Sequence, residues 1–223
     1  MILQNKDRLI HHIHIPRTGG RYLYNVLQKA GYYDVANSWG FWEGYQVLHL
    51  SYNQAKRYYL KRHWTEDSFA VVRNPIDKFC SALYTFFECT NIKDVNLLED
   101  REYFIWVLEE KPMFIKGGSE YHEKIQFYHN GLKQCFNHFW SPQFKHIGPS
   151  TKVWKYEDGY NDNFKEWLKE EVNINVSDIN LEEISYKERY FDNHKIDISD
   201  KIKDNILEYY YNDFVRFYPN YIL

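Results

Sequence analysis

Apolar residues near the start of the chain change from a strand-like to a helix-like spacing. The run from Leu9 to Ile15 is rich in β-branched residues and ends at Pro16. Two adjacent glycines, Gly19 and Gly20, follow, and apolar positions then recur at helical intervals from Tyr22 to Leu27. The pattern predicts a strand, a tight loop and a helix in succession.

Two similar pairs come next along the chain. Residues Tyr45–Leu50 are predicted to form a strand and Asn53–Arg62 a helix; Ser68–Val72, continuously apolar, is typical of a strand buried on both faces. Pro75 suits the first turn of a helix that continues to about Glu88. Three strand–helix units predict an α/β fold, a three-layer sandwich around a parallel sheet, which binds ligands beyond the carboxyl ends of its strands.

The remaining chain is less regular but shows no Pro/Gly/Ser-rich linker, so we expect one domain over residues 1–223. Residues 91–140 are expected to be a helical insertion that covers an acceptor pocket. The further predicted elements are helices over Tyr103–Glu110 and Tyr121–Asn137, a strand over Thr151–Lys155, and helices over Phe164–Glu171 and Asp200–Phe217.

Composition limits the classes of partner. The 223 residues carry a formal net charge of −3 with both signs interspersed, so neither a nucleic-acid surface nor a membrane-binding face is indicated. The N-terminus lacks the apolar core of a signal peptide and no run of about 18 apolar residues occurs, so we expect a soluble, cytoplasmic protein. Aromatic residues make up 19% of the chain and suit either core packing or the stacking of sugars.

Cysteine usage points to reduced thiols. The three cysteines, Cys80, Cys89 and Cys135, are odd in number, widely spaced and not arranged as Cys-x-x-Cys. This argues against a disulfide framework and against a zinc site.

The loop after the first strand has the chemistry of an anion site. A glycine loop at a helix start directs backbone N–H groups outward where the helix dipole favours negative charge. Arg17 lies in this loop and Arg21 opens the helix, and arginine suits bidentate contact with oxyanions. The simpler alternative is a glycine turn whose arginines are only solvated.

A second arginine motif follows the third predicted strand. Arg73 comes directly after the buried strand, Pro75 begins the next helix, and Ser81 lies two turns into it. Arg73 and Ser81 can therefore converge on a second anion.

These two motifs resemble those of sulfotransferases that use 3′-phosphoadenosine 5′-phosphosulfate (PAPS). Pro16–Gly20 is similar to the family's Pro-Lys-Thr-Gly-Gly, and Arg73, Pro75 and Ser81 match Arg-x-Pro-x-x-Arg-x-x-Ser, with Lys78 in place of the second arginine. The stretches Tyr156–Asp158 and Tyr211–Tyr218 are also similar to recurring features of the family.

The resemblance implies a P-loop NTPase-like sulfotransferase fold and a carbohydrate O-sulfotransferase-like branch. It assigns the 5′-phosphosulfate to the first motif and the 3′-phosphate to Arg73 and Ser81. The first set comprises Arg17, Thr18, Gly19, Gly20, Arg21 and Tyr22.

The first motif departs from the family at three positions. Arg17 replaces the lysine that steadies the departing phosphate, with a bulkier planar head. Arg21 and Tyr22 replace small hydroxyl residues.

Sulfuryl transfer needs an acceptor oxygen held in line, stabilisation of the leaving phosphate and a base for the acceptor proton. The resemblance implies a carbohydrate hydroxyl as acceptor and no metal requirement. His49 is the candidate base, since the family often carries a histidine in this interval and imidazole titrates near neutrality. Glu43 is the reserve candidate.

The sequence also admits other interpretations. His12 and His14 share a strand face next to His11, but two ligands without a third are weak evidence for a metal. Cys80 suits packing better than nucleophilic catalysis. A P-loop kinase would need Gly-x-x-x-x-Gly-Lys-Ser/Thr, which is absent. A non-catalytic module that binds adenosine 3′,5′-bisphosphate stays open as an alternative.

Overall fold

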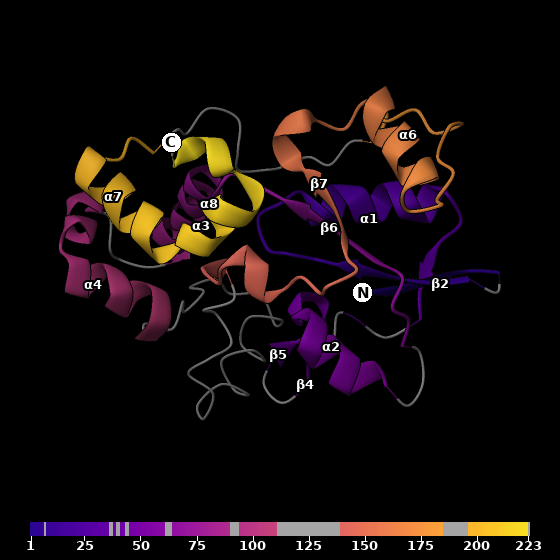
Figure 1. Cartoon of the computed structure of the whole chain (residues 1–223), viewed down its shortest axis with the longest axis horizontal. Coiled ribbons are helices and arrows are strands. Elements are labelled where there is room, and N and C mark those ends of the chain that lie inside the picture. The colour runs from indigo at the N-terminus through magenta and orange to yellow at the C-terminus, as the bar shows by residue number, and fades with distance from the viewer. Residues whose placement is uncertain are drawn as a thin grey trace. The chain divides into compact units, whose positions relative to one another are not determined.

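The chain forms two compact units (Figure 1). The computed structural model describes residues 1–6, 8–35, 38, 41–42, 45–60, 64–89, 94–110, 139–184 and 196–222. The first unit comprises Met1–Trp42, Gln46–Arg73 and Lys145–Asp192, and the second Glu43–Tyr45, Asn74–Phe144 and Asn193–Leu223.

A five-stranded mixed sheet organises the first unit. Its strands run in the order β3-β1-β2-β6-β7. The bounds are β1 Ile2–Asn5, β2 Arg8–Ile13, β3 Tyr33–Asp34, β6 Ser68–Val72 and β7 Lys152–Lys155. The three strands β2, β6 and β7 are parallel, whereas β1 is antiparallel to both of its neighbours.

The α/β class is therefore confirmed, but a wholly parallel sheet is wrong. The difference comes from β1, which the sequence pattern did not identify. Its pairing with β2 closes at Asn5 opposite Arg8, with Lys6 in left-handed backbone at φ 53°. A chain that reverses within two residues forms a hairpin, and hairpin strands are antiparallel.

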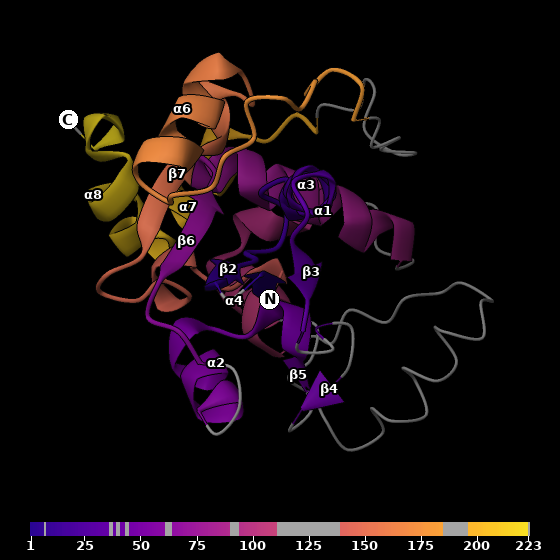
Figure 2. The same cartoon turned by 90° about the vertical axis from the view of Figure 1, so that its right-hand side faces the viewer.

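Helices cover both faces of this sheet (Figures 1 and 2). Helices α1 (Gly20–Lys29) and α6 (Asp162–Glu170) pack on one face, where Leu23 and Phe164 join Ile10 and Phe69 in a fully buried core. Helix α2 (Tyr52–Tyr59) covers the other face, and its Tyr59 ring contacts His11 of β2. The predicted strand Ser68–Val72 is confirmed as β6, with all five residues buried.

The segment predicted as a strand over Tyr45–Leu50 is different in the structure. Only Tyr45–Gln46 is extended, as β5, and it pairs with β4 (Phe41–Trp42) outside the main sheet. Residues Val47–His49 form a 3-10 turn, η1, that buries Val47 and Leu48. The capping box of Ser51 and Gln54 starts α2 immediately afterwards, which leaves no room for a longer strand.

The second unit is helical in its described part. Helix α3 (Pro75–Cys89) matches the predicted helix, and Phe79 packs against Phe104 and Trp140 at ring distances of 5.5 and 5.3 Å. The further elements are η2 Val95–Glu99, α4 Arg101–Ile105, the π-helical η3 Trp106–Glu110, η5 Gln143–Lys145 (its last residue is assigned to the first unit), α7 Asp200–Tyr209, α8 Tyr211–Phe217 and η7 Pro219–Tyr221. The helix predicted over Tyr121–Asn137 lies outside the described residues.

The single helix predicted over Asp200–Phe217 is two helices. Tyr210 breaks it, with φ −100° and ψ 20°. Its hydroxyl donates a hydrogen bond of 2.6 Å to the Trp140 carbonyl oxygen, and its own carbonyl accepts from the Asp213 N–H. The buried tyrosine therefore fixes a bend that helical spacing alone does not reveal.

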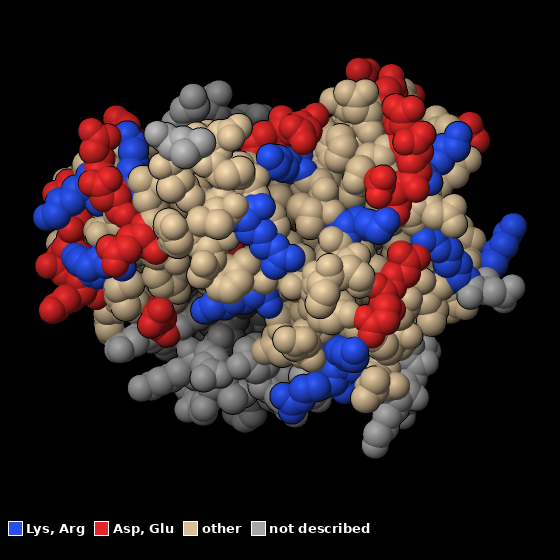
Figure 3. Space-filling model, viewed as in Figure 1, with Lys and Arg blue, Asp and Glu red and all other residues tan. Residues whose placement is uncertain are grey.

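Surface charge and cysteine chemistry do little to narrow the location of a functional site. Acidic side chains gather over α6 and around α7, with lysine and arginine among them, on the face in Figure 3. Cys80 forms no disulfide. Among the described residues we find no helix with the length and apolarity needed to cross a bilayer.

Candidate anion-binding site

The loop between β2 and α1 has the backbone geometry expected of an anion cradle. Gly19 is left-handed, at φ 78° and ψ 14°, and Gly20 begins the helix. A left-handed residue followed by a right-handed one turns successive N–H groups toward the same side. Gly19 caps α1 without a side-chain hydrogen bond, and no acidic residue lies in the first turn. The start of α1 therefore suits an external anion.

Two tyrosines from the segment after β7 pack against this loop. The Tyr160 hydroxyl donates a 3.1 Å hydrogen bond to the Thr18 carbonyl oxygen. A Cβ atom on Gly19 would lie 2.6 Å from the Tyr160 Oη and 3.0 Å from the Tyr156 ring. Burial raises the pKa of Tyr160 far above its usual range, so the hydroxyl stays protonated and remains a donor. Glycine at position 19 is thus required both by φ and by the ring contacts.

Arg73 lies beside the same loop. It follows β6 directly, is half-buried, and its Nη1 donates a 3.3 Å hydrogen bond to the Arg17 carbonyl oxygen. Its guanidinium lies over the Tyr156 ring, 4.6 Å from the centroid. The arginine of the second sequence motif and the loop of the first therefore share one corner of the first unit.

Tyr22 and Thr18 have side chains engaged within the protein. The Tyr22 ring stacks on Tyr160 at 4.7 Å and its hydroxyl donates to the Leu181 carbonyl oxygen at 2.8 Å. The buried Thr18 hydroxyl donates to the Ile15 carbonyl oxygen at 2.8 Å. Their contribution to an anion would come from backbone N–H groups. Arg21 is exposed on the first turn of α1.

The candidate base His49 is connected to this loop through one other histidine. His49, half-buried in η1, has its ring centroid 5.0 Å from that of His14. The His14 ring in turn lies so close to the Gly20 backbone that a Cβ there would overlap it. The sequence assigned no part in the site to His14. The reserve candidate Glu43 lies outside the described residues.

Ser81 lies in the second unit, half-buried in α3. Helix α3 starts as predicted, with Asn74 Oδ1 accepting from the Ile76 N–H at 2.9 Å. Lys78, at the position of the family's second arginine, is only 1% exposed and donates to the carbonyl oxygens of Phe139 and Ser141 at 2.9 and 3.1 Å. Lys78 is therefore engaged in holding the fold of its unit.

The neighbouring histidines occupy different surroundings. His11 contacts Tyr59 and Trp64, whereas His12 stacks on Phe69 on the opposite face of β2. Burial holds the pKa of both well below 6.5, so both are neutral at physiological pH. Within the described ranges, no group of three or more His, Cys, Asp or Glu could hold a metal ion.

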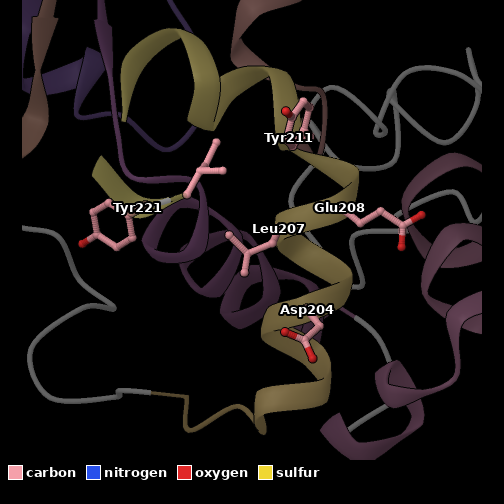
Figure 4. A pocket seen from close by; sticks show the side chains of 6 residues that line it. Asp204, Leu207, Glu208, Tyr211 and Tyr221 are labelled. Carbon is pink, nitrogen blue, oxygen red and sulfur yellow. The ribbon is translucent and has the colours of Figure 1, made fainter. Parts of the chain in front are cut away.

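A hollow of about 340 Å³ occurs in the second unit, between α7 and the end of the chain (Figure 4). It is open to solvent, and it is formed by none of the anion-site residues above. Its lining residues are Asp204, Leu207, Glu208, Tyr211, Tyr221 and Ile222.

Two important members of the site, Tyr156 and Tyr160, had no assigned role in the sequence. A signal was present, because Tyr156 directly follows a predicted strand whose end lies at the ligand-binding edge of an α/β sheet.

Comparisons with protein-family models, curated proteins and solved structures find no significant match to this chain.

Proposed function

We propose that the protein is a sulfotransferase that moves the sulfuryl group of PAPS to an acceptor hydroxyl on a carbohydrate. The observation that carries the proposal is the position of Arg73 beside the loop of Arg17 and Gly19, with an Nη1 hydrogen bond of 3.3 Å to that loop. Two separate sequence motifs, each typical of one anionic end of the nucleotide, contribute to this corner. The proposal includes the P-loop NTPase-like sulfotransferase fold.

The residues present suit such a nucleotide. The left-handed Gly19 and the uncapped start of α1 offer backbone donors, and Arg17 and Arg73 supply positive charge. Bound PAPS would supply a sulfuryl group on a good leaving phosphate. In our proposal the loop and Arg17 hold the 5′ end, and Arg73 holds the 3′-phosphate.

His49 would take the proton from the acceptor hydroxyl. The ring contact with His14 limits the orientations that the His49 imidazole can adopt. A base in fixed orientation near the reacting atoms lowers the barrier by positioning as well as by proton transfer.

Binding and transfer test different parts of this proposal. We expect adenosine 3′,5′-bisphosphate to bind to the protein in the presence of EDTA, as measured by calorimetry. Arg73→Ala should weaken this binding by about 10-fold or more, because one charge-assisted hydrogen bond is lost. The second sequence motif predicts that Ser81→Ala also weakens binding. His49→Ala should leave binding unchanged and abolish transfer of labelled sulfate to a glycan panel. Transfer that survives in His49→Ala would remove this base assignment.

A non-catalytic module that binds the bisphosphate is the second candidate. The replacement of the family lysine by Arg17, and the Tyr22 hydroxyl engaged with Leu181, favour it. Tight binding without transfer to any hydroxyl acceptor would select the module. Binding of ATP that requires magnesium would instead support a P-loop kinase and contradict both.

A further inference from the structure

Arg73 and Tyr156 are brought together by strand register. Strands β6 and β7 are parallel, and Val72 lies opposite Lys155 as their last pair. The next residue on each strand is Arg73 and Tyr156 respectively. The sheet therefore delivers both side chains to the same carboxyl edge, where an α/β fold binds its ligands.

The position of the Tyr156 ring is fixed from a second side. Its ring meets Tyr160 edge-on at a centroid distance of 6.0 Å, and Tyr160 is hydrogen bonded to the loop at Thr18. The Tyr156 Cε2 atom also lies 3.0 Å from the place of a Cβ on Gly19. The ring is thus held against the loop rather than projecting into solvent.

Contact with an aromatic ring suits an arginine that must bind an anion. The Arg73 guanidinium carbon lies over the Tyr156 ring, 4.6 Å from the ring centroid, which is a cation–π contact. An arginine ordered before the ligand arrives loses less side-chain entropy on binding.

We propose that Tyr156 is a positioning residue, which holds the Arg73 guanidinium at the anion loop for the phosphate groups of the nucleotide. This inference rests on the proposed function. It assigns the effect to the aromatic ring and none to the hydroxyl.

Calorimetric titration with adenosine 3′,5′-bisphosphate tests this assignment. Tyr156→Leu should raise the Kd by about 3- to 30-fold, the range of a cation–π contact, whereas Tyr156→Phe keeps the ring and should stay within about twofold of the parent. Tyr156→Leu combined with Arg73→Ala should bind no more weakly than Arg73→Ala alone. Thermal melts check that each variant is folded, and Tyr156→Met replaces the leucine variant if that one unfolds.

The outcomes separate this inference from the proposed function. A parent chain that fails to bind the bisphosphate overturns both. A parent that binds, with Tyr156→Leu and Tyr156→Met equally tight, overturns only the positioning role. An equal loss in Tyr156→Phe and Tyr156→Leu would place the effect on the hydroxyl and would also overturn it.

Discussion

At the scale of single residues, the anion loop contains unfavourable backbone. Arg17 has φ 68°, a conformation that costs a non-glycine residue about 1–2 kcal/mol. Strain of this kind persists where the surroundings hold it, and it is frequent at binding sites. The carbonyl of Arg17 accepts the hydrogen bond of Arg73, which is one contact that holds this conformation.

Gly19 offers a test of how tightly the tyrosines hold the loop. Gly19→Ala should destabilise the protein more than Gly31→Ala, although both glycines have similar φ values of 78° and 82°. The strain shared by both positions costs about 1 kcal/mol. At Gly19 the new Cβ would also lie 2.6 Å from the Tyr160 oxygen, whereas at Gly31 its nearest neighbour would be the Asn5 Nδ2, 3.5 Å away. Denaturant unfolding measures the two losses.

A second substitution identifies the atom responsible. Tyr160→Phe removes the oxygen nearest to the new Cβ, so it should return part of the stability lost in Gly19→Ala. In the parent background the same change removes the hydrogen bond to Thr18 and should be destabilising. If Gly19→Ala and Gly31→Ala lose equal stability, the packing argument for the loop is wrong.

At the scale of elements, the sequence predicted what strong local patterns specify. β6 and α3 were predictable because four consecutive apolar residues, Phe69–Val72, and a proline at the helix start are unambiguous signals. β1 was missed since four residues with mixed polarity gain their stability from pairing with β2, which is not local. The bend at Tyr210 likewise depends on a hydrogen bond to Trp140, 70 positions away.

Lys78 also depends on contacts that are distant in sequence, and these contacts predict the effect of replacing it. Lys78→Met should destabilise the protein by about 1–3 kcal/mol for each of the partly buried carbonyls, at Phe139 and Ser141, that loses its donor. Urea unfolding measures the change. The control is Lys203→Met, in the same unit, whose exposed ion pair with Asp200 should matter little. Equal effects of the two variants would contradict a structural role for Lys78.

At the scale of the whole molecule, the charge balance makes nucleotide binding a local effect. The chain has 28 basic and 31 acidic residues, and the face in Figure 3 mixes both signs. A long polyanion needs an extended basic surface, whereas a small doubly phosphorylated nucleotide needs only a few aligned donors and cations. Binding to the nucleotide without binding to nucleic acid is therefore the expected combination.

Salt dependence makes this expectation measurable. Raising the ionic strength from 0.1 to 1 M shortens the Debye length from about 10 to about 3 Å, so adenosine 3′,5′-bisphosphate should bind several-fold more weakly. A 20-nucleotide DNA strand should not bind measurably even at low salt, and uncharged adenosine serves as the control for contacts to the base. Fluorescence anisotropy and calorimetry read these affinities. DNA binding that falls steeply with salt would mean that an extended basic surface, and not this loop, recognises the ligand.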